Sequence, residues 1–216
     1  MNGAVIRPYQ KQDRPAIRKI ACDTAFIGEP AERFFADREI LADILTKYFT
    51  DFEPGSALVA EVDGKVSGYL LGAVDVRQMK KIFTAKILPA LIGKIIIRGT
   101  LLHGKNLLMG YYYLRSMFKG ELSSPDLDRD YPATLHINID INSRAHGLGA
   151  DLISKYLSYL KGRNITGVHF GTISEKAAAF FTKQGFQLLF KNTRSYHRNL
   201  VAQDVNFYIY GKKLAA

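Results

Sequence analysis

The sequence has a single cysteine, Cys22, among its 216 residues, and it has no long hydrophobic run. One cysteine excludes a disulfide framework within the chain, which fits a reducing compartment. A membrane-spanning helix needs about 18 or more consecutive apolar residues, and no such run is present. The first residues, MNGAVIRPYQKQDR, lack the basic and then apolar pattern of a secretory signal. We therefore expect a cytoplasmic protein.

Acidic residues are absent from residues 77–120, although the chain has 20 Asp and Glu in all. The same window holds nine Lys and Arg, which account for nearly all of the formal net charge of +10. Such a block can bind phosphates, anionic lipid or nucleic acid, and it is equally typical of the solvated face of an inserted helical segment. No nucleic-acid-binding motif accompanies it, so nucleic acid is not an expected partner.

The composition, with 47% hydrophobic and 23% charged residues, is that of a soluble globular protein. We expect one domain over residues 1–216 that carries a basic helical insert at about 77–130. Apolar residues at helical spacing predict two amphipathic helices in this insert. Their apolar stripes are Leu88, Leu91, Ile92 and Ile95 in the first helix and Leu107, Tyr111, Leu114 and Phe118 in the second. These helices could pack over the functional site, meet an anionic membrane surface or pair with a second copy of the chain.

Outside the insert, strands and helices alternate. Asp63-Gly64 lies between two apolar runs in SALVAEVDGKVSGYLLGAV, a pattern typical of a hairpin whose two turn residues have positive φ. The segment TLHINIDI predicts a strand, and GADLISKYLSYLKGRN predicts a helix after it. The apolar stripe of that helix is Leu148, Leu152, Tyr156 and Leu160.

Between this strand and this helix lies a glycine-rich turn, NSRAHGLGA, at residues 142–150. It is not a P-loop, because it lacks the lysine and hydroxyl pair, and Leu152 stands where a dinucleotide fingerprint needs a third glycine. What remains is Arg144-x-x-Gly147-x-Gly149. Backbone N–H groups at the start of the helix would point at an anion, and glycine permits its close approach. The turn predicts a phosphate site.

The order strand, Arg-x-x-Gly-x-Gly, helix, strand and a short helix ending in FFTKQGF resembles the Gcn5-related N-acetyltransferase (GNAT) family. IRPYQKQDRPAIRKI is similar to that family's first strand and helix, and LVAEVDGKVSGYLLG is similar to its second and third strands. The resemblance covers about residues 4–76 and 132–214 and leaves the basic insert outside. YPATLHINI is also similar to the acetyltransferase-like domains attached to bacterial and animal O-GlcNAcases.

The resemblance implies an α/β (α+β) fold: a mixed, mostly antiparallel sheet of six or seven strands with helices on both faces. Its fourth and fifth strands would splay apart to admit acetyl-CoA, and no metal is implied. The backbone of Ile139 and Ile141 would pair with the pantetheine arm, Arg144 would support a phosphate, and Ser174 and Phe181 would line the arm. The backbone amides that would hold the pyrophosphate are those of Ala145, His146, Gly147, Leu148, Gly149 and Ala150.

Acetyl transfer from a thioester to an amine needs a base for the amine proton. Residues alternate between the two faces of a strand, so His136, Asn138 and Asp140 are predicted to share one polar face. His136 is the expected general base, because an ordinary histidine pKa of about 6.5 suits this role. Asp140 is the alternative base or could orient the substrate, and Asn138 could hydrogen-bond the acceptor.

The family pattern is broken at two positions. It commonly has Asn where this chain has Ser174, and a Tyr that can protonate the leaving thiolate where this chain has Phe181. Tyr196 or one of Tyr111 to Tyr113 could replace that acid. Three functions therefore stay open. They are acetyl transfer from acetyl-CoA to a primary amine of a small molecule or peptide, acyl-CoA binding by an inactive sensor module, and anionic-surface binding through the basic insert.

Overall fold

The computed structural model describes residues 3–144 and 147–214. Its centre is a seven-stranded sheet in the order β1-β2-β3-β4-β5-β7-β6. The strands are β1 (Val5–Pro8), β2 (Ala57–Val62), β3 (Lys65–Ala73), β4 (Ala133–Ile139), β5 (Gly167–Thr172), β6 (Gln187–Arg194) and β7 (Val205–Lys213). Neighbouring strands are antiparallel except for the parallel pair β4 and β5. The predicted mixed, mostly antiparallel sheet is confirmed.

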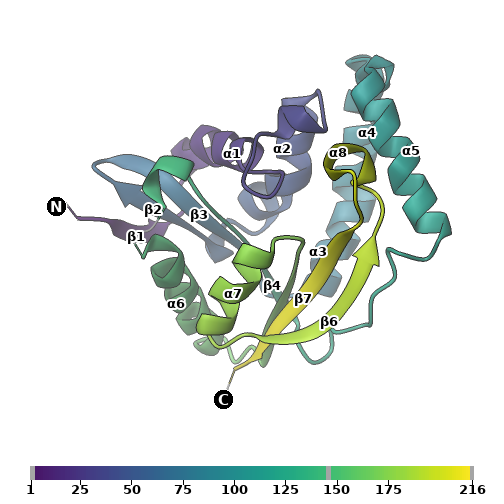
Figure 1. Ribbon diagram of the computed structural model, residues 1–216. Helices are drawn as coiled ribbons and strands as arrows, with labels where there is room; N and C mark the ends of the chain where they lie inside the picture. Colours follow the sequence, from purple (N-terminus) through teal and green to yellow (C-terminus); the bar gives the residue numbers. More distant parts are fainter. Residues whose placement is uncertain (1–2, 145–146, 215–216) are drawn as a thin grey trace.

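Helices cover both faces of this sheet, as predicted. They are α1 (Arg14–Asp23), α2 (Arg38–Lys47), α3 (Val76–Ile82), α4 (Leu88–Ile97), α5 (Gly104–Phe118), α6 (Leu148–Lys161), α7 (Glu175–Lys183) and α8 (Arg198–Val201). Figure 1 shows α1 and α2 above the sheet, α6 and α7 on the opposite face, and α4 and α5 standing at one side of the molecule. Within the described residues, no helix is both long and apolar enough to cross a membrane.

Side-chain alternation along the strands supplies a core to each face. Leu58 and Leu70 on β2 and β3 belong to the cluster that contains Leu152 of α6. Val59, between such positions, belongs instead to the cluster that contains Ile17 of α1. The central strands are therefore apolar on both sides, because each side is covered by a helix.

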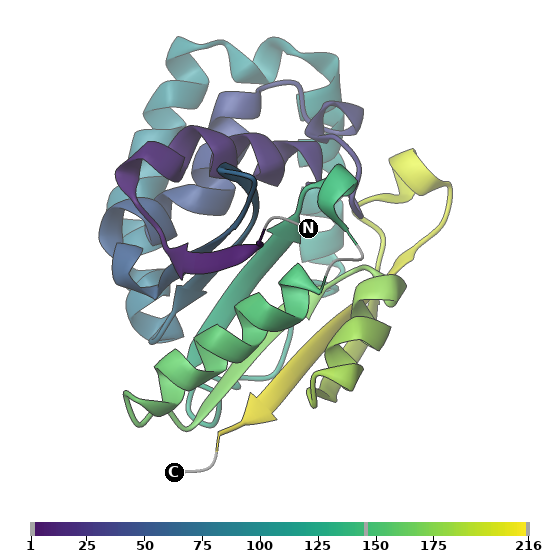
Figure 2. The same cartoon turned by 90° about the vertical axis from the view of Figure 1, so that its left-hand side faces the viewer.

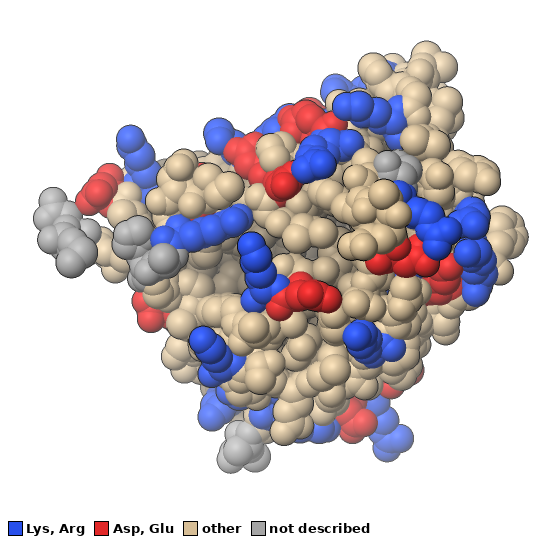
Figure 3. Space-filling view, in the orientation of Figure 1, with Lys and Arg blue, Asp and Glu red and all other residues tan. Residues whose placement is uncertain are grey.

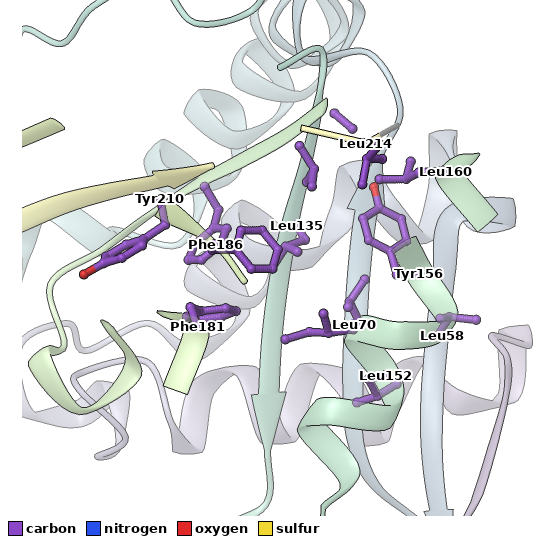
Figure 4. Close-up of a cluster of buried hydrophobic side chains, with 14 of the residues drawn as sticks. Leu58, Leu70, Leu135, Leu152, Tyr156, Leu160, Phe181, Phe186, Tyr210 and Leu214 are labelled. Atoms are coloured by element: carbon purple, nitrogen blue, oxygen red, sulfur yellow. The ribbon is translucent and has the colours of Figure 1, made fainter. Parts of the chain in front are cut away.

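The predicted apolar stripe of α6 is confirmed as its buried face. Its four members are 0–2% exposed: Leu148, Leu152, Tyr156 and Leu160. Figure 4 shows Leu152 and Tyr156 on one side of β4 and Phe181 and Phe186 on the other. Burial of each such side chain contributes about 1.5–3 kcal/mol relative to leaving it in water, so this stripe fixes α6 against the sheet.

The hairpin turn between β2 and β3 is also confirmed. Asp63 and Gly64 have φ values of 50° and 74°, as a two-residue turn with positive φ at both positions requires. The insert forms the two predicted helices, α4 and α5, preceded by α3. The predicted stripe of α4 is only partly covered, because Leu91 is 3% exposed but Leu88 and Ile92 are 40% and 49% exposed. The predicted stripe of α5 is 51–85% exposed: Leu107, Tyr111, Leu114 and Phe118.

Candidate functional site

The two halves of the sheet part between β4 and β5. These strands pair only at Ala133 with Val168 and at Thr134 with His169. Beyond that point β4 continues beside β3 as far as Ile139, and β5 continues beside β7 as far as Thr172. Figure 2 shows the green β4 and the yellow β7 close together at the lower left and apart toward the top. The splayed strands that the resemblance implied are therefore present.

The glycine-rich turn lies at the open end of this split. β4 ends at Ile139, a helical turn covers Ile141–Ser143, and α6 begins at Leu148. The N–H groups in the first turn of an α-helix have no intrahelical partner, and the N-cap residue Gly147 offers no side chain to accept from them. Ala150 donates its N–H to the carbonyl of the N-cap residue Gly147 at 2.9 Å, so the donors without a partner among the described residues are those of Leu148 and Gly149. Ala145 and His146, two of the predicted pyrophosphate ligands, lie outside the described residues.

The two glycines of the turn have different structural roles. Gly147 has φ of 76°, a left-handed conformation that side chains other than those of Asn and Asp rarely adopt, and a Cβ there would meet open space. A Cβ on Gly149 would lie 3.1 Å from Cζ of Phe180 on α7. Gly147 therefore shapes the turn, and Gly149 permits the close packing of α6 against α7. Both roles leave the backbone at the anion site uncovered.

Arg144 reaches from the turn to the segment that joins α1 and α2. It is exposed, and its Nη2 atom lies 3.0 Å from where a Cβ on Gly28 would stand. Gly28 sits in a tight turn closed by a bridge between Phe26 and Glu29. The guanidinium thus lies between two loops at the open end of the sheet. Figure 3 shows this face hollowed below α1 and α2, with Lys and Arg side chains beside the hollow.

His136 and Asn138 lie together on the face of β4 that also meets Tyr69 of β3. Asn138 Nδ2 donates to the Tyr69 hydroxyl at 2.8 Å and lies 3.3 Å from His136 Nε2. A carboxamide has two N–H groups, so one can serve each partner, and donation to Nε2 places the imidazole proton on Nδ1. Tyr69 is fully buried on the neighbouring strand, so the residue pattern of β4 alone does not predict its contact with Asn138.

The environment of His136 makes its imidazole a weaker base. Burial lowers its pKa to about 4. The imidazole is therefore neutral at physiological pH and can accept a proton, but it is a weaker base than an ordinary histidine. The pKa of 6.5 on which the base assignment rested does not hold in the folded chain. The assignment itself stays a prediction.

Asp140 does not continue the strand. β4 ends one residue earlier, and the Asp140 carboxylate accepts the N–H of Asn142 at 2.9 Å, which caps the turn at Ile141–Ser143. The prediction that Asp140 shares a face with Asn138 required β4 to extend through residue 140, and it does not. A role of Asp140 in orienting the amine stays a prediction, and its visible role is to shape the glycine-rich turn.

Ser174 and Phe181 lie at the start and in the middle of α7. Ser174 is the N-cap residue, and its hydroxyl accepts the N–H of Ala177 at 3.3 Å, which leaves the hydroxyl proton available to a ligand. Phe181 is 4% exposed, and its ring centroid lies 4.1 Å from that of Phe170. In this structure Phe181 is a core residue, and contact with pantetheine stays a prediction.

An aromatic cluster joins the segment before α8 to the segment between α1 and α2. His197 packs edge-on against Phe26 and Phe34, with centroid separations of 5.1 and 6.0 Å, and it also contacts Tyr196. Burial lowers the pKa of His197 to about 4, and its Nδ1 atom is buried with no hydrogen-bond partner among the described residues. Residue patterns did not reveal His197, since Phe26 and Phe34 are distant from it in the sequence.

Comparison with known proteins supports the fold only through structure. No family model matches the sequence, and no curated protein matches it. The protein SsHAT superposes with a TM-score of 0.74 at 23% identity, over 99% of this chain and 100% of that one. A polyamine N-acetyltransferase of Drosophila melanogaster, which forms N-acetylagmatine, has a TM-score of 0.62 at 14% identity, over 98% of this chain and 100% of that one.

A further similar structure contains acetyl-CoA. It is a GNAT superfamily phosphinothricin acetyltransferase from Sinorhizobium meliloti, with a TM-score of 0.59 at 12% identity, over 98% of this chain and 89% of that one. The chain therefore has the fold of the Gcn5-related N-acetyltransferases, as the order of its motifs predicted. A specific link to the acetyltransferase-like domains of O-GlcNAcases is not established by these similarities.

Proposed function

We propose that this chain, which has the GNAT fold, transfers an acetyl group from acetyl-CoA to a primary amine of a small molecule or peptide. The observation that carries the proposal is the coincidence of three features at one end of the sheet. They are the split between β4 and β5, the left-handed Gly147, and the uncapped N-terminus of α6. Similar structures with acetyltransferase activity by name support this assignment.

Acetyl-CoA would lie in the split with its charged end toward α6. The backbone N–H groups of Leu148 and Gly149 would donate to the pyrophosphate, where the helix dipole adds to their effect. Arg144 would neutralise part of its charge. The free edge of β4 near Ile139 would hydrogen-bond the amide groups of the pantetheine arm as an added strand does.

The acceptor amine would approach from the side of His136 and Asn138. The side-chain Oδ1 of Asn138 has no hydrogen-bond partner in the described part of the chain, so it can accept from the amine. His136 would take the proton that the amine loses, directly or through water. Tyr69 acts as a positioning residue, because its hydroxyl accepts one Asn138 N–H and fixes the carboxamide plane.

An acyl-CoA-binding module without catalysis is the second candidate. The burial of Phe181 in the core favours it, since the residue at this position cannot protonate a thiolate. A coenzyme A thiolate is a fair leaving group, however, so the loss of the acid would cost about one or two powers of ten in rate rather than all activity. Binding and turnover must therefore be measured separately.

The binding test is calorimetric titration of acetyl-CoA into wild-type protein and three variants. Asp and Asn both tolerate positive φ, so Gly147→Asp and Gly147→Asn should fold. We expect Gly147→Asp to weaken binding by at least about 30-fold through repulsion of the pyrophosphate, and Gly147→Asn to weaken it less. Gly104→Asp, at the start of α5, is the matched control and should leave the affinity unchanged. Absence of binding to folded wild-type protein would refute the proposal.

The turnover test measures coenzyme A release across a panel of primary amines with a thiol reagent. The protein's own thiol gives little background, because Cys22 is the only cysteine and is 1% exposed. His136→Gln should lower kcat with little change in acetyl-CoA affinity. Tight acetyl-CoA binding with no release for any amine would favour the sensor module instead.

A further inference from the structure

Exposed apolar side chains are concentrated on the helical hairpin formed by α4 and α5. Of the nineteen large apolar side chains that are exposed in the described chain, thirteen lie between Leu88 and Phe118. Ile97, Leu102 and Phe118 are 85–87% exposed, as they would be in an unfolded segment. Together these side chains expose on the order of 1,000 Å², whereas the largest apolar patch on a typical monomer is about 300–600 Å².

The polarity of α5 is the reverse of that of an ordinary surface helix. The residues that it buries are polar, Asn106 at 3% exposure and Ser116 at 0%. Asn106 accepts the N–H of Ala36 at 2.8 Å and donates to the carbonyl of Thr100 at 2.6 Å. The stripe centred on Tyr111 faces solvent. Since most helix stability in proteins comes from packing an apolar face, this stripe requires a partner.

Three cations of the hairpin contact the rest of the chain, and two of them form ion pairs there. Lys94 pairs with Asp43 at 2.5 Å, and Arg98 pairs with Asp37 at 2.8 Å. Lys105 donates to the carbonyl of Glu32 at 3.0 Å. Figure 3 shows uncharged side chains covering most of the tip of the hairpin, at the upper right, with Lys and Arg on its inner side. The tip of the hairpin is therefore mostly apolar on its outer side.

We propose that the outer surface of α4 and α5 is the interface of a homodimer. A standard protein interface buries about 800 Å² on each partner, and homodimer interfaces are more apolar and rich in aromatic residues and Met. The area and composition of the hairpin surface meet both requirements. An interfacial membrane helix instead presents free Lys and Arg to lipid headgroups, whereas Lys94 and Arg98 are paired with Asp43 and Asp37 of the same chain.

The spacing of the stripe suggests how two copies meet. Leu107, Tyr111, Leu114 and Phe118 follow one side of α5 over the length of the helix. Dimers of identical chains are most often two-fold symmetric, with the same patch on both subunits. The middle of the stripe, at Tyr111 and Leu114, therefore lies near the two-fold axis and next to the same residues of the second copy.

The first test is the molar mass of the folded chain by sedimentation equilibrium at micromolar concentration. We expect a dimer for wild type and a monomer for Leu114→Glu, which would raise the dimer Kd by at least about tenfold. Leu188→Glu is the matched control, since Leu188 on β6 is 50% exposed and Leu114 is 51% exposed. It should remain a dimer. A monomeric wild type, or a dimeric Leu114→Glu that is folded by circular dichroism, would overturn the proposal.

The second test places a thiol at the expected axis. Cys22 is buried, so a short bismaleimide should react with a cysteine introduced in place of Tyr111 rather than with Cys22. Tyr111→Cys should cross-link into a covalent dimer, and Leu188→Cys should not. Co-sedimentation with phosphatidylserine vesicles tests the alternative: a monomeric protein that pellets with vesicles through Leu114 would replace the dimer interface by a membrane surface.

Discussion

The helices α6 and α5 are nearly the same length, 14 and 15 residues, and each carries an apolar stripe at helical spacing. The stripe of α6 is 0–2% exposed, whereas that of α5 is 51–85% exposed. The difference does not lie in the periodicity, which is equally clear in both. It lies in what faces them. The stripe of α6 packs in one cluster with Leu58, Leu70 and Leu135 of the sheet. The side of α5 that faces the rest of the chain has only Asn106 and Ser116 buried, with Met109 partly buried.

A hydrophobic stripe therefore predicts that a helix forms and which face needs cover, but it does not identify the cover. In α6 the cover is within the chain, so the stripe contributes to the stability of the fold. In α5 we propose that the cover is a second chain, so the stripe contributes to assembly. Changes in the two stripes should accordingly affect different measurements.

The largest effect is expected for truncation in the buried stripe. Leu152 is 0% exposed, and Leu152→Ala should lower the free energy of unfolding by about 2–5 kcal/mol, because it removes buried apolar surface and leaves a cavity. Leu114→Ala, the same change in α5, should cost less than about 0.5 kcal/mol when it is measured at a protein concentration well below the Kd of the proposed dimer. Urea unfolding followed by circular dichroism suits a chain without tryptophan. Equal costs in the two helices would contradict the comparison.

A smaller effect is expected at the ion pairs that hold the hairpin to the rest of the chain. The carboxylate of Asp43 is 3% exposed and pairs with both Arg18 and Lys94 at 2.5 Å. Asp43→Asn should destabilise the fold by about 2 kcal/mol, less than for a fully buried pair because Lys94 reaches solvent.

The matched control for this change is Asp126→Asn. Asp126 is 71% exposed and lies 3.6 Å from Arg77, so its loss should change stability by less than about 0.5 kcal/mol. Thermal unfolding of both variants at neutral pH measures the difference. If Asp43→Asn were as mild as the control, the hairpin would not be held by its inner cations.

The parts of the fold that follow from local pattern were predictable from sequence. The Asp63-Gly64 turn needs two residues that tolerate positive φ, and the α6 stripe needs only helical spacing. The split between β4 and β5 and the role of the turn at Gly147 came instead from resemblance to a family, because residue spacing alone does not reveal how far two parallel strands pair.

The parts that depend on distant residues were not predictable. The basic window has no acid of its own, yet Asp43 and Asp37 neutralise Lys94 and Arg98 from 51 and 61 positions away. The pKa of His136 depends on burial by neighbouring elements, which strand alternation does not report. Strand alternation extended β4 to Asp140, whereas the strand ends at Ile139 and the Asp140 side chain caps the following turn. The exact end of a strand does not follow from alternation.

Acid should destabilise the folded chain through two histidines, His136 and His197. The folded pKa of His136 and of His197 is about 4, below the ordinary value of 6.5. The unfolded state therefore binds more protons between these values, so the stability is complete above about pH 6.5 and falls as the pH drops toward 4. Each histidine should account for about 1–3 kcal/mol of that loss.

Denaturant unfolding at pH 7.0 and 4.5 measures this loss in wild type and in single His→Gln variants. His136→Gln and His197→Gln should each flatten the pH dependence. A flat profile in wild type would mean that solvent reaches both imidazoles in the folded chain.

The smallest effect is expected when a glycine of α5 or of α6 is replaced by alanine. This change tests how closely each helix packs against its neighbours. A Cβ on Gly110 of α5 would meet nothing within 4 Å, whereas one on Gly149 of α6 would lie 3.1 Å from Phe180. Gly110→Ala should raise the free energy of unfolding by about 0.5–1 kcal/mol in dilute solution, because alanine loses less backbone entropy in a helix. Gly149→Ala should gain less, since the new methyl group presses on Phe180. If Gly149→Ala were equally stabilising in thermal unfolding, α6 and α7 would be packed less closely than the structure shows, and close approach would not explain the second glycine of the turn.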